Sequence, residues 1–244
     1  MPRFFVPSDA FSDNSVFIRG EDAFHIARSL RMAVGDEITV CDMQKREYNC
    51  TLVKIRDSEC ECQINSVTEG KTESPVYIKL FMAYPKADKL ETVIQKAVEL
   101  GASEIIPFES SRCIKKPSPE RIEKQTARLE RIAEEAAKQC GRATLPKISL
   151  PLSYKEAIGE AKKSELPIFC YEGDGANSLK KIFEGSPAAK SVSVIVGSEG
   201  GFSKDEASFA EKAGLRIANL GPRILRCETA PLYALSAISF FFEL

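Results

Sequence analysis

From Val76 onward the sequence alternates between apolar runs typical of buried strands and amphipathic runs typical of helices, and this alternation restricts the fold more than any other feature. The run 76–84 predicts a strand, and apolar side chains then recur at helical spacing until Gly101. Ser118 and Pro119 have the identities of an N-cap and a first helical residue, so they predict the start of a long helix. Because strands that alternate with helices form mostly parallel sheets covered on both faces, we expect an α/β domain.

Helix starts in this region carry a recurring signal, in which Asp or Ser is followed three residues later by Glu. This is the spacing of a capping box, where each of the two side chains accepts a hydrogen bond from the backbone N–H of the other residue. We expect such a box at the start of three helices, formed by Asp88 with Glu91, Ser153 with Glu156, and Ser203 with Glu206.

The first 72 residues follow a different pattern. One short helix is predicted over 21–31, with Phe24, Ala27 and Leu30 on one face. The polar stretch 68–75 is rich in breaker residues and indicates a linker. We therefore expect a small, mostly antiparallel β barrel or sandwich over residues 1–72 and a separate domain over 73–244. β-branched residues and partial alternation predict the strands of the first domain at 16–18, 37–40, 48–55 and 60–64.

The composition narrows the class of protein and its surroundings. The formal net charge is −1, so a polyanionic partner would have to meet a local basic patch. Apolar runs are shorter than the roughly 18 residues of a membrane span, and the N-terminus lacks the layout of a secretory signal. Eight cysteines without an export signal indicate reduced thiols, hence a cytoplasmic protein without a membrane partner. His25 is the sole histidine and no CxxC pair occurs, so we expect no metal.

Two glycine-containing turns near the C-terminus are the strongest candidates for a ligand site. The first, Gly197-Ser-Glu-Gly-Gly-Phe-Ser203, follows the apolar run 191–196. The second, Gly221-Pro-Arg-Ile-Leu-Arg-Cys-Glu-Thr-Ala230, follows the run 216–220. Each turn lies after a predicted strand and before a predicted helix. In open α/β sheets this is where ligands bind.

The residues of the first turn exclude two common phosphate-binding loops. The turn lacks the Gly-x-Gly-x-x-Gly spacing of dinucleotide folds, and no Gly-Lys-Ser/Thr follows, so the lysine of a P-loop is missing. Glu199 would also repel a phosphate. Glycines beside a carboxylate suit a ligand with hydroxyls and a positive centre, such as a nucleoside that carries a sulfonium. Exposed backbone in the second turn could frame an adenine, which favours a ligand site over the other open interpretation, a simple strand-to-helix turn.

Together with three further groups of motifs, these turns resemble the ribosomal RNA small subunit methyltransferase E family of the SPOUT-class methyltransferases. The likeness covers almost the whole chain, and its motifs occur in the order found in the family. The sequence departs from the family at Ser198, where proline is usual, and at Lys138, where an acidic residue is usual. The further matching residues are Arg3-Phe-Phe, His25-x-x-Arg28-x-Leu30-Arg31, Gly35-Asp36, Lys86-x-Asp88-Lys89-x-Glu91, Gln95-Lys96-Ala97-x-Glu99-Leu100-Gly101 and Gln139-Cys140-Gly141-Arg142.

The resemblance implies a fold and an activity that periodicity and spacing do not reach. It implies a SPOUT-type α/β methyltransferase domain whose glycine turns belong to a deep trefoil knot, preceded by a small PUA-like β-barrel domain. It implies S-adenosylmethionine as cofactor and methylation of N3 of a specific uridine in 16S ribosomal RNA of the small ribosomal subunit. It also implies a homodimer, with the last helix and the helix near residue 90 at the interface. The apolar run 234–242 suits burial against a partner or in the chain's own core.

Candidate site residues follow from this hypothesis. Arg226 is the first candidate to stabilise the developing uridine anion or to hold its phosphate, and Glu199 is a weaker candidate as base or as a holder of the cofactor. Cys227 is expected only to pack. Candidates for RNA binding, each otherwise a solvated surface charge, are Arg28, Arg31, Lys86, Lys89 and Arg142. The candidate cofactor-binding residues are Tyr171, Val196, Gly197, Glu199, Gly200, Leu220, Gly221, Arg223, Leu225, Arg226 and Thr229.

Two other classes of function stay open. An RNA-binding ribosome-assembly factor that keeps the cofactor fold but has little activity would carry the same motifs. A nicotinamide-dependent oxidoreductase fits less well, because the dinucleotide fingerprint is missing.

Overall fold

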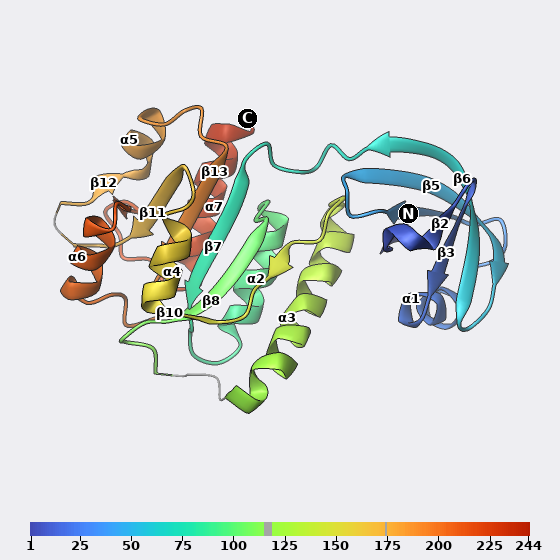
Figure 1. Cartoon of the computed structure of the whole chain (residues 1–244), viewed down its shortest axis with the longest axis horizontal. Coiled ribbons are helices and arrows are strands. Elements are labelled where there is room, and N and C mark those ends of the chain that lie inside the picture. Colours follow the sequence, from blue (N-terminus) through green and yellow to red (C-terminus); the bar gives the residue numbers. More distant parts are fainter. Residues whose placement is uncertain (115–118, 174) are drawn as a thin grey trace. The chain divides into compact units, whose positions relative to one another are not determined.

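The chain folds into two compact units, drawn in the computed structural model of Figure 1. The structure describes residues 1–114, 119–173 and 175–244. The first unit comprises Met1–Glu73 and Ala137–Leu145, and the second comprises Ser74–Ala136 and Pro146–Leu244.

The first unit is built on one mixed sheet. Its strands are β1 (Arg3–Phe5), β2 (Phe11–Ser12), β3 (Ser15–Arg19), β4 (Glu37–Cys41), β5 (Arg46–Ile55) and β6 (Glu59–Glu69), with a 3-10 turn η1 (Ser8–Ala10) before β2. They lie in the order β1-β4-β5-β6-β3-β2, and only the pairing of β1 with β4 is parallel among the pairs the structure describes. The predicted strands are confirmed. β6 is longer than expected and enters the predicted linker, because its antiparallel pairing with β5 continues to Glu69.

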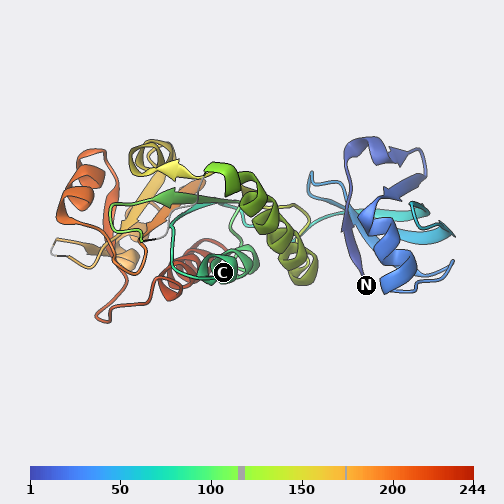
Figure 2. The ribbon, with the colours of Figure 1, turned by 90° about the horizontal axis from the view of Figure 1, so that it is seen from below.

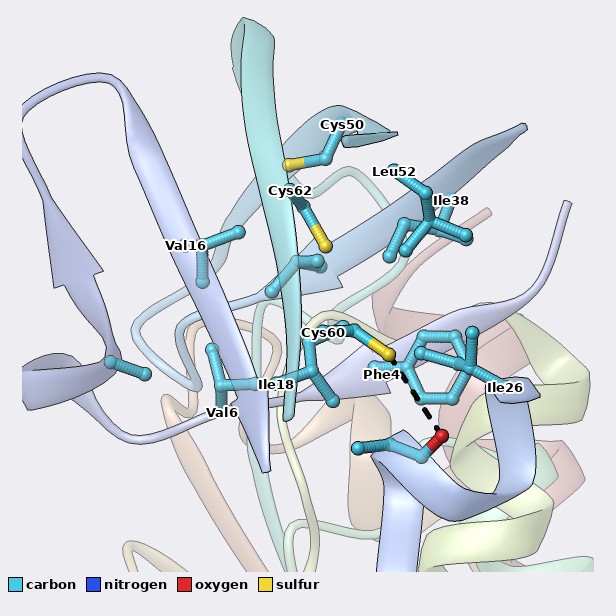
Figure 3. Packing of buried hydrophobic residues seen from close by; sticks show 13 residues of the cluster. Phe4, Val6, Val16, Ile18, Ile26, Ile38, Cys50, Leu52, Cys60 and Cys62 are labelled. Atoms are coloured by element: carbon cyan, nitrogen blue, oxygen red, sulfur yellow. Dashed lines mark hydrogen bonds between the residues drawn. The ribbon is translucent and has the colours of Figure 1, made fainter. Parts of the chain in front are cut away.

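Side chains from these strands and from the segments between them, Ile26 among them, form one hydrophobic core, shown in Figure 3. Cys60 and Cys62 are both fully buried, as their spacing on one face of a strand predicts. Burial raises the pKa of the Cys50 and Cys62 thiols to about 12, so both stay protonated at neutral pH. These cysteines are therefore packing residues of the core.

The helix predicted over 21–31 has a different register in the structure. α1 (Glu21–Phe24) continues into a π-helical turn, η2 (His25–Ser29), after which the N–H of Leu30 bonds to the carbonyl five residues back. Phe24 and Leu30, on the predicted apolar face, are 53% and 41% exposed, whereas Ile26 is fully buried. The extra residue in a π-helical turn rotates the side chains that follow, so an ordinary helical period misplaces Leu30. Phe24 lies before that turn, in α1, where Ala23 is the buried residue.

A buried ion pair anchors the segment 137–145 within the first unit. Arg142 is 4% exposed, and its Nη2 lies 2.6 Å from Oε2 of Glu73. The same carboxylate accepts the backbone N–H groups of Ala143 and Thr144 at 3.0 and 3.1 Å. Burial acts to raise the pKa of Glu73, but the hydrogen bonds, that from Arg142 first among them, outweigh it and hold the pKa below its ordinary value. Such a pair stabilises the unit only while both partners are present.

The second unit is built on a parallel sheet, which confirms the expected α/β class. The sheet order is β10-β8-β7-β13-β11-β14-β12, β9 pairs with β8, and all described pairings are parallel. The strands are β7 (Tyr77–Ala83), β8 (Glu104–Glu109), β9 (Lys147–Ile148), β10 (Leu152–Ser153), β11 (Leu166–Cys170), β12 (Asn177–Ser178), β13 (Ser191–Val196) and β14 (Arg216–Asn219).

Helices cover both faces of this sheet. The helices after β7 are α2 (Lys89–Glu99), α3 (Pro119–Cys140), α4 (Tyr154–Ala161), α5 (Leu179–Glu184), α6 (Lys204–Lys212) and α7 (Thr229–Phe242). The end of α3, from Ala137, belongs to the first unit. Figure 2 shows α2 and α7 side by side on one face and α4 on the opposite face. The rings of Phe183 and Phe241, 5.3 Å apart, join α5 to α7, and those of Tyr154 and Phe209, 6.0 Å apart, join α4 to α6. In the part of the chain that is described, no helix has the length and hydropathy needed to cross a membrane.

Two of the three predicted capping boxes are present in the structure. The capping boxes at the starts of α4 and α6 are both formed. At α2 the expected box is absent: the side chain of Asp88 caps nothing, and Glu91 pairs instead with Arg128 at 2.9 Å. Ser118, the expected N-cap of α3, lies outside the described residues. The buried stripe of α2 is as predicted, with Leu90, Val93, Ile94, Ala97 and Val98.

We expect Arg142→Met to destabilise the first unit strongly, because it leaves the buried Glu73 carboxylate without its partner. The free energy of unfolding, measured by urea denaturation, should fall by about 3–5 kcal/mol. Arg131→Met is the matched control, because Arg131 is 75% exposed in its pair with Glu135. The control should change stability by less than about 1 kcal/mol. Equally small effects in both variants would contradict a structural role for Arg142.

Candidate functional site

The carboxyl ends of three neighbouring strands form one edge of the parallel sheet. β11 pairs with β13 on one side, Phe169 opposite Ile195, and with β14 on the other, Cys170 opposite Ala218. Because all three strands run in the same direction, the turns that follow β13 and β14 emerge at the same edge. The chain that leaves β11 at Tyr171 emerges between them.

The first turn depends on its glycines for close packing. A β-carbon on Gly197 would lie 3.1 Å from Cα of Gly201, and one on Gly200 would lie 2.9 Å from Cβ of Arg112. Gly201 has a φ of +60°, and its N–H donates to the carbonyl of Ser198 at 2.9 Å. The turn therefore closes with serine at the position where proline is usual. Its glycines let backbone segments approach closely as well as reverse the chain.

The second turn leaves much of its backbone outside regular structure. Gly221 has a φ of +101°, and its N–H lies 3.3 Å from Oδ1 of Asn219. Residues 220–226 belong to no helix or strand, and the side chains of Arg223 and Arg226 are exposed. The carbonyl of Arg226 accepts the first two N–H groups of α7 at 2.9 Å. Open backbone groups in this turn are free to meet a ligand.

The two turns and the chain after β11 line a cavity of about 590 Å³, within the usual size of a small-molecule pocket. Thr229, the first residue of α7, is the one expected cofactor-binding residue that does not line it. The expected residues that the structure brings together in the cavity wall are Tyr171, Val196, Gly197, Glu199, Gly200, Leu220, Gly221, Arg223, Leu225 and Arg226.

Lys89 of α2 links the two turns by ion pairs. Its Nζ lies 3.1 Å from Oε1 of Glu199, in the first turn, and 3.0 Å from Oε2 of Glu228, at the end of the second. The Glu199 carboxylate also accepts the backbone N–H of Lys86, at 3.1 and 3.2 Å from its two oxygens. Both turns and the loop before α2 therefore share one charged network, which we call the Lys89 network.

The Lys89 network keeps its groups charged at neutral pH. The pKa of Glu228 is lowered to about 2. The largest cause is a hydrogen bond from the backbone N–H of Glu228 itself, and the second is the hydrogen bond from Cys227. Burial acts to raise the pKa of Glu199, but backbone N–H groups and Lys89 outweigh it, so this pKa is also below its ordinary value. Two hydrogen bonds raise the pKa of Lys89, and the bond to Glu228 contributes more than the bond to Glu199. With lowered carboxyl pKa values, the ion pairs are complete above the ordinary carboxyl pKa and are lost only as pH falls through the lowered values.

Cys227 is a neutral thiol beside this network. Burial raises its pKa to about 12, and its Sγ donates to Oε2 of Glu228 at 3.2 Å. Because the thiolate is the nucleophilic form, a thiol with this pKa is a poor nucleophile at neutral pH. This supports the expectation that Cys227 only packs.

Three of the candidate RNA-binding residues are exposed. The side chains of Arg31 and Lys86 form no hydrogen bond or ion pair with any described residue. Nε of Arg28 donates to Oδ1 of Asp57 at 2.9 Å, and the bond from Arg28 holds the pKa of that carboxyl below its usual value. The Arg28 side chain is still 62% exposed.

The other two candidates have different surroundings from those expected. Arg142 is buried against Glu73, so its guanidinium could reach a phosphate only by uncovering a buried carboxylate. The expectation of an exposed cation is corrected here to a structural ion pair. Lys89 lies in the cavity wall with its ammonium held by Glu199 and Glu228, which makes it a support for the two turns.

Three residues that shape the site escaped prediction from the sequence. Glu172 follows Tyr171 just after β11 and lines the cavity, and the apolar run 166–170 before it was a usable signal of a strand end. Glu228 completes the Lys89 network. Nη1 of Arg112 donates to the carbonyl of Gly200 at 2.8 Å. That approach depends on how the chain folds after β8, which no local pattern specifies.

Two family models match the chain. The model described as an RNA methyltransferase domain matches residues 72–239, a range that contains the whole lining of the cavity. The model described as an RNA methyltransferase PUA domain matches residues 18–65, which lie in the first unit.

Two similar proteins from different bacteria carry the same name. The ribosomal RNA small subunit methyltransferase E of Bacillus subtilis is 34% identical, over 93% of this chain and 90% of that protein. The protein of the same name from Mesomycoplasma hyopneumoniae is 33% identical, over 83% of this chain and 86% of that protein. Among solved structures, the ribosomal RNA small subunit methyltransferase E from Neisseria gonorrhoeae bound to S-adenosyl methionine has a TM-score of 0.86 and 30% identity. That likeness covers 98% of this chain and 97% of the other.

We expect Lys89→Met to loosen both turns, because it keeps the aliphatic stem and removes only the ammonium. Amide hydrogen exchange, followed by mass spectrometry, should become severalfold faster in peptides covering 197–203 and 220–230. Lys86→Met is the matched control, because Lys86 contacts Glu199 only through its backbone N–H. Unchanged exchange in Lys89→Met would show that the ion pairs do not hold the turns.

Proposed function

The chain belongs to the ribosomal RNA small subunit methyltransferase E family, and we propose on this premise that it transfers a methyl group from S-adenosylmethionine to N3 of a specific uridine in 16S ribosomal RNA. The observation that carries the proposal is the cavity between the two glycine turns, with the cation of Arg226 exposed in its wall.

The cavity residues fit S-adenosylmethionine. The open backbone of residues 220–225 offers donors and acceptors to an adenine edge, and the glycines of the first turn permit close approach. Glu172 adds a carboxylate acceptor for hydroxyl or positively charged groups. When bound, the cofactor supplies an electrophilic methyl group on a sulfonium. The ten expected residues that line the cavity are the proposed contacts, and Thr229 is placed outside this set.

Arg226 is the proposed catalytic residue. N3 of uridine carries a proton, so methylation there requires loss of that proton and stabilisation of the imide anion that develops. The Arg226 side chain lines the cavity and forms no ion pair with any residue in the described part of the chain. A cation without another partner is available to the developing anion or to the uridine phosphate.

Glu199 is proposed as a support of the cavity wall. Its carboxylate already accepts the N–H of Lys86 and pairs with Lys89, and its pKa lies below the ordinary value. An efficient general base has a pKa near the working pH, which Glu199 lacks. In this scheme the N3 proton leaves to solvent while Arg226 stabilises the anion.

The two parts of the chain are proposed to have separate functions, RNA binding and methyl transfer. Residues 1–72 serve as a PUA-like RNA-binding domain, and residues 73–244 serve as the SPOUT-type methyltransferase domain. Arg28, Arg31 and Lys86 are the proposed phosphate contacts, since each is exposed. RNA binding should therefore weaken as the salt concentration rises. The proposal includes the family's trefoil knot around the two turns and a cytoplasmic location.

Transfer to N3 can be read directly on rRNA from a strain that lacks this protein. A methyl group on N3 blocks the Watson–Crick edge, so reverse transcriptase stops one nucleotide before the product. Incubation with S-adenosylmethionine and either small subunits or naked 16S rRNA should create one new stop. Arg226→Ala should lower its rate of formation by about 100-fold or more, while the Kd for S-adenosylmethionine changes little.

Arg216→Ala is the matched control for this assay, because Arg216 is an exposed arginine of β14 that does not line the cavity. The control should keep normal transfer. Near-normal transfer by Arg226→Ala would contradict the assignment of Arg226. If the unmodified protein binds the cofactor but creates no stop on either substrate, an RNA-binding assembly factor becomes the better function.

We further propose that the protein forms a homodimer through α7 and α2. Tyr233 and Phe240 of α7 are 47% and 74% exposed, and their spacing of seven residues places them on one helical face. α2 lies beside α7, so the two helices present a joint surface (Figure 2). Exposed large apolar side chains that gather on one face are typical of protein interfaces.

Phe240→Glu should convert the dimer to a monomer, because the interface would have to bury a carboxylate without a partner. Sedimentation velocity measures this change directly. Leu150→Glu is the control, since Leu150 is 59% exposed in a loop of the same unit and lies on neither helix. A dimer that persists in Phe240→Glu would place the interface elsewhere.

A further inference from the structure

Among the residues that the structure describes, two carboxylates line the cavity, and their surroundings differ. Glu199 is occupied by the backbone N–H of Lys86 and by the ammonium of Lys89. Glu172 is exposed and forms no hydrogen bond or ion pair within the described chain. An ionised carboxylate has about four acceptor positions. The acceptor positions of the Glu172 carboxylate are therefore available to a ligand, whereas those of Glu199 are largely occupied by groups of the protein.

The position of Glu172 is set by the order of the strands. It follows Tyr171 at the end of β11, which lies between the strands that lead into the two glycine turns. Oε1 of Glu172 lies 3.2 Å from the place where a β-carbon of Gly201 would stand, so the carboxylate reaches the first turn. Any side chain at residue 201 would occupy that place.

The backbone next to Glu172 is held by close packing. A β-carbon on Gly173 would lie 2.1 Å from the ring of Tyr171, so the ring packs directly over the Gly173 backbone. This contact restricts the backbone on both sides of Glu172.

From this placement we infer that Glu172 binds the ribose of S-adenosylmethionine, accepting hydrogen bonds from its two neighbouring hydroxyls. The inference rests on the proposed function and adds the residue that recognises the sugar. The open backbone of the second turn suits the adenine, and the ribose is bonded directly to that base. A carboxylate between the two turns is therefore placed for the sugar, and acidic residues near strand ends take this role in dinucleotide-binding folds.

Calorimetry with two ligands tests the assignment. S-adenosylhomocysteine has the same ribose without the sulfonium charge, and its 2′-deoxy analogue lacks one hydroxyl. The unmodified protein should bind the 2′-deoxy analogue about tenfold more weakly. Glu172→Ala should bind S-adenosylhomocysteine about tenfold or more weakly and should discriminate little between the two ligands. Glu172→Gln, which keeps the length of the side chain, should have an intermediate effect.

Glu184→Ala is the matched control, because Glu184 is an exposed glutamate of α5 outside the cavity wall and pairs only with Lys180 at the surface of the described chain. It should leave both Kd values unchanged. Full discrimination against the 2′-deoxy ligand in Glu172→Ala would overturn the inference. A larger loss for S-adenosylmethionine than for S-adenosylhomocysteine would also overturn it, since Glu172 would then face the sulfonium. Absence of binding to the unmodified protein would instead reject the proposed function itself.

Discussion

The pairing of β11 with β13 on one side and β14 on the other is the constraint on which the candidate site depends. Parallel strands end at a common edge, so two turns that are separate in sequence meet across the end of β11. β11 and β13 are mostly buried, and a shift of one residue would turn each side chain to the opposite face of the sheet. The cavity is therefore a consequence of strand order and register, and neither turn would form it alone.

Charged residues around the cavity fall into two groups, which differ in whether the protein itself supplies their ion-pair partners. Lys89, Glu199 and Glu228 bond to one another and hold the two turns together. Arg223, Arg226 and Glu172 line the cavity without an ion pair to any other residue that is described. The first group is satisfied by the protein itself, so its charges are already stabilised before a ligand arrives. The second group is left for the cofactor and the RNA.

Local patterns in the sequence predicted most of the second unit. The buried stripe of α2, the capping boxes of α4 and α6 and the parallel sheet follow from spacings of a few residues, which a sequence displays directly. The two glycine turns located the cavity for the same reason. The burial of Arg142 was not predictable in this way, because its partner Glu73 is 69 residues away in the chain. The exposed Leu30 was misplaced because the π-helical turn before it breaks the ordinary helical period.

The cavity between the two glycine turns is the proposed site of S-adenosylmethionine. A crystal structure of this protein grown with the cofactor tests this placement most directly. We expect one cofactor per chain, in contact with residues of both turns and with the chain that follows β11. Cofactor density at another place, with this cavity empty, would contradict it.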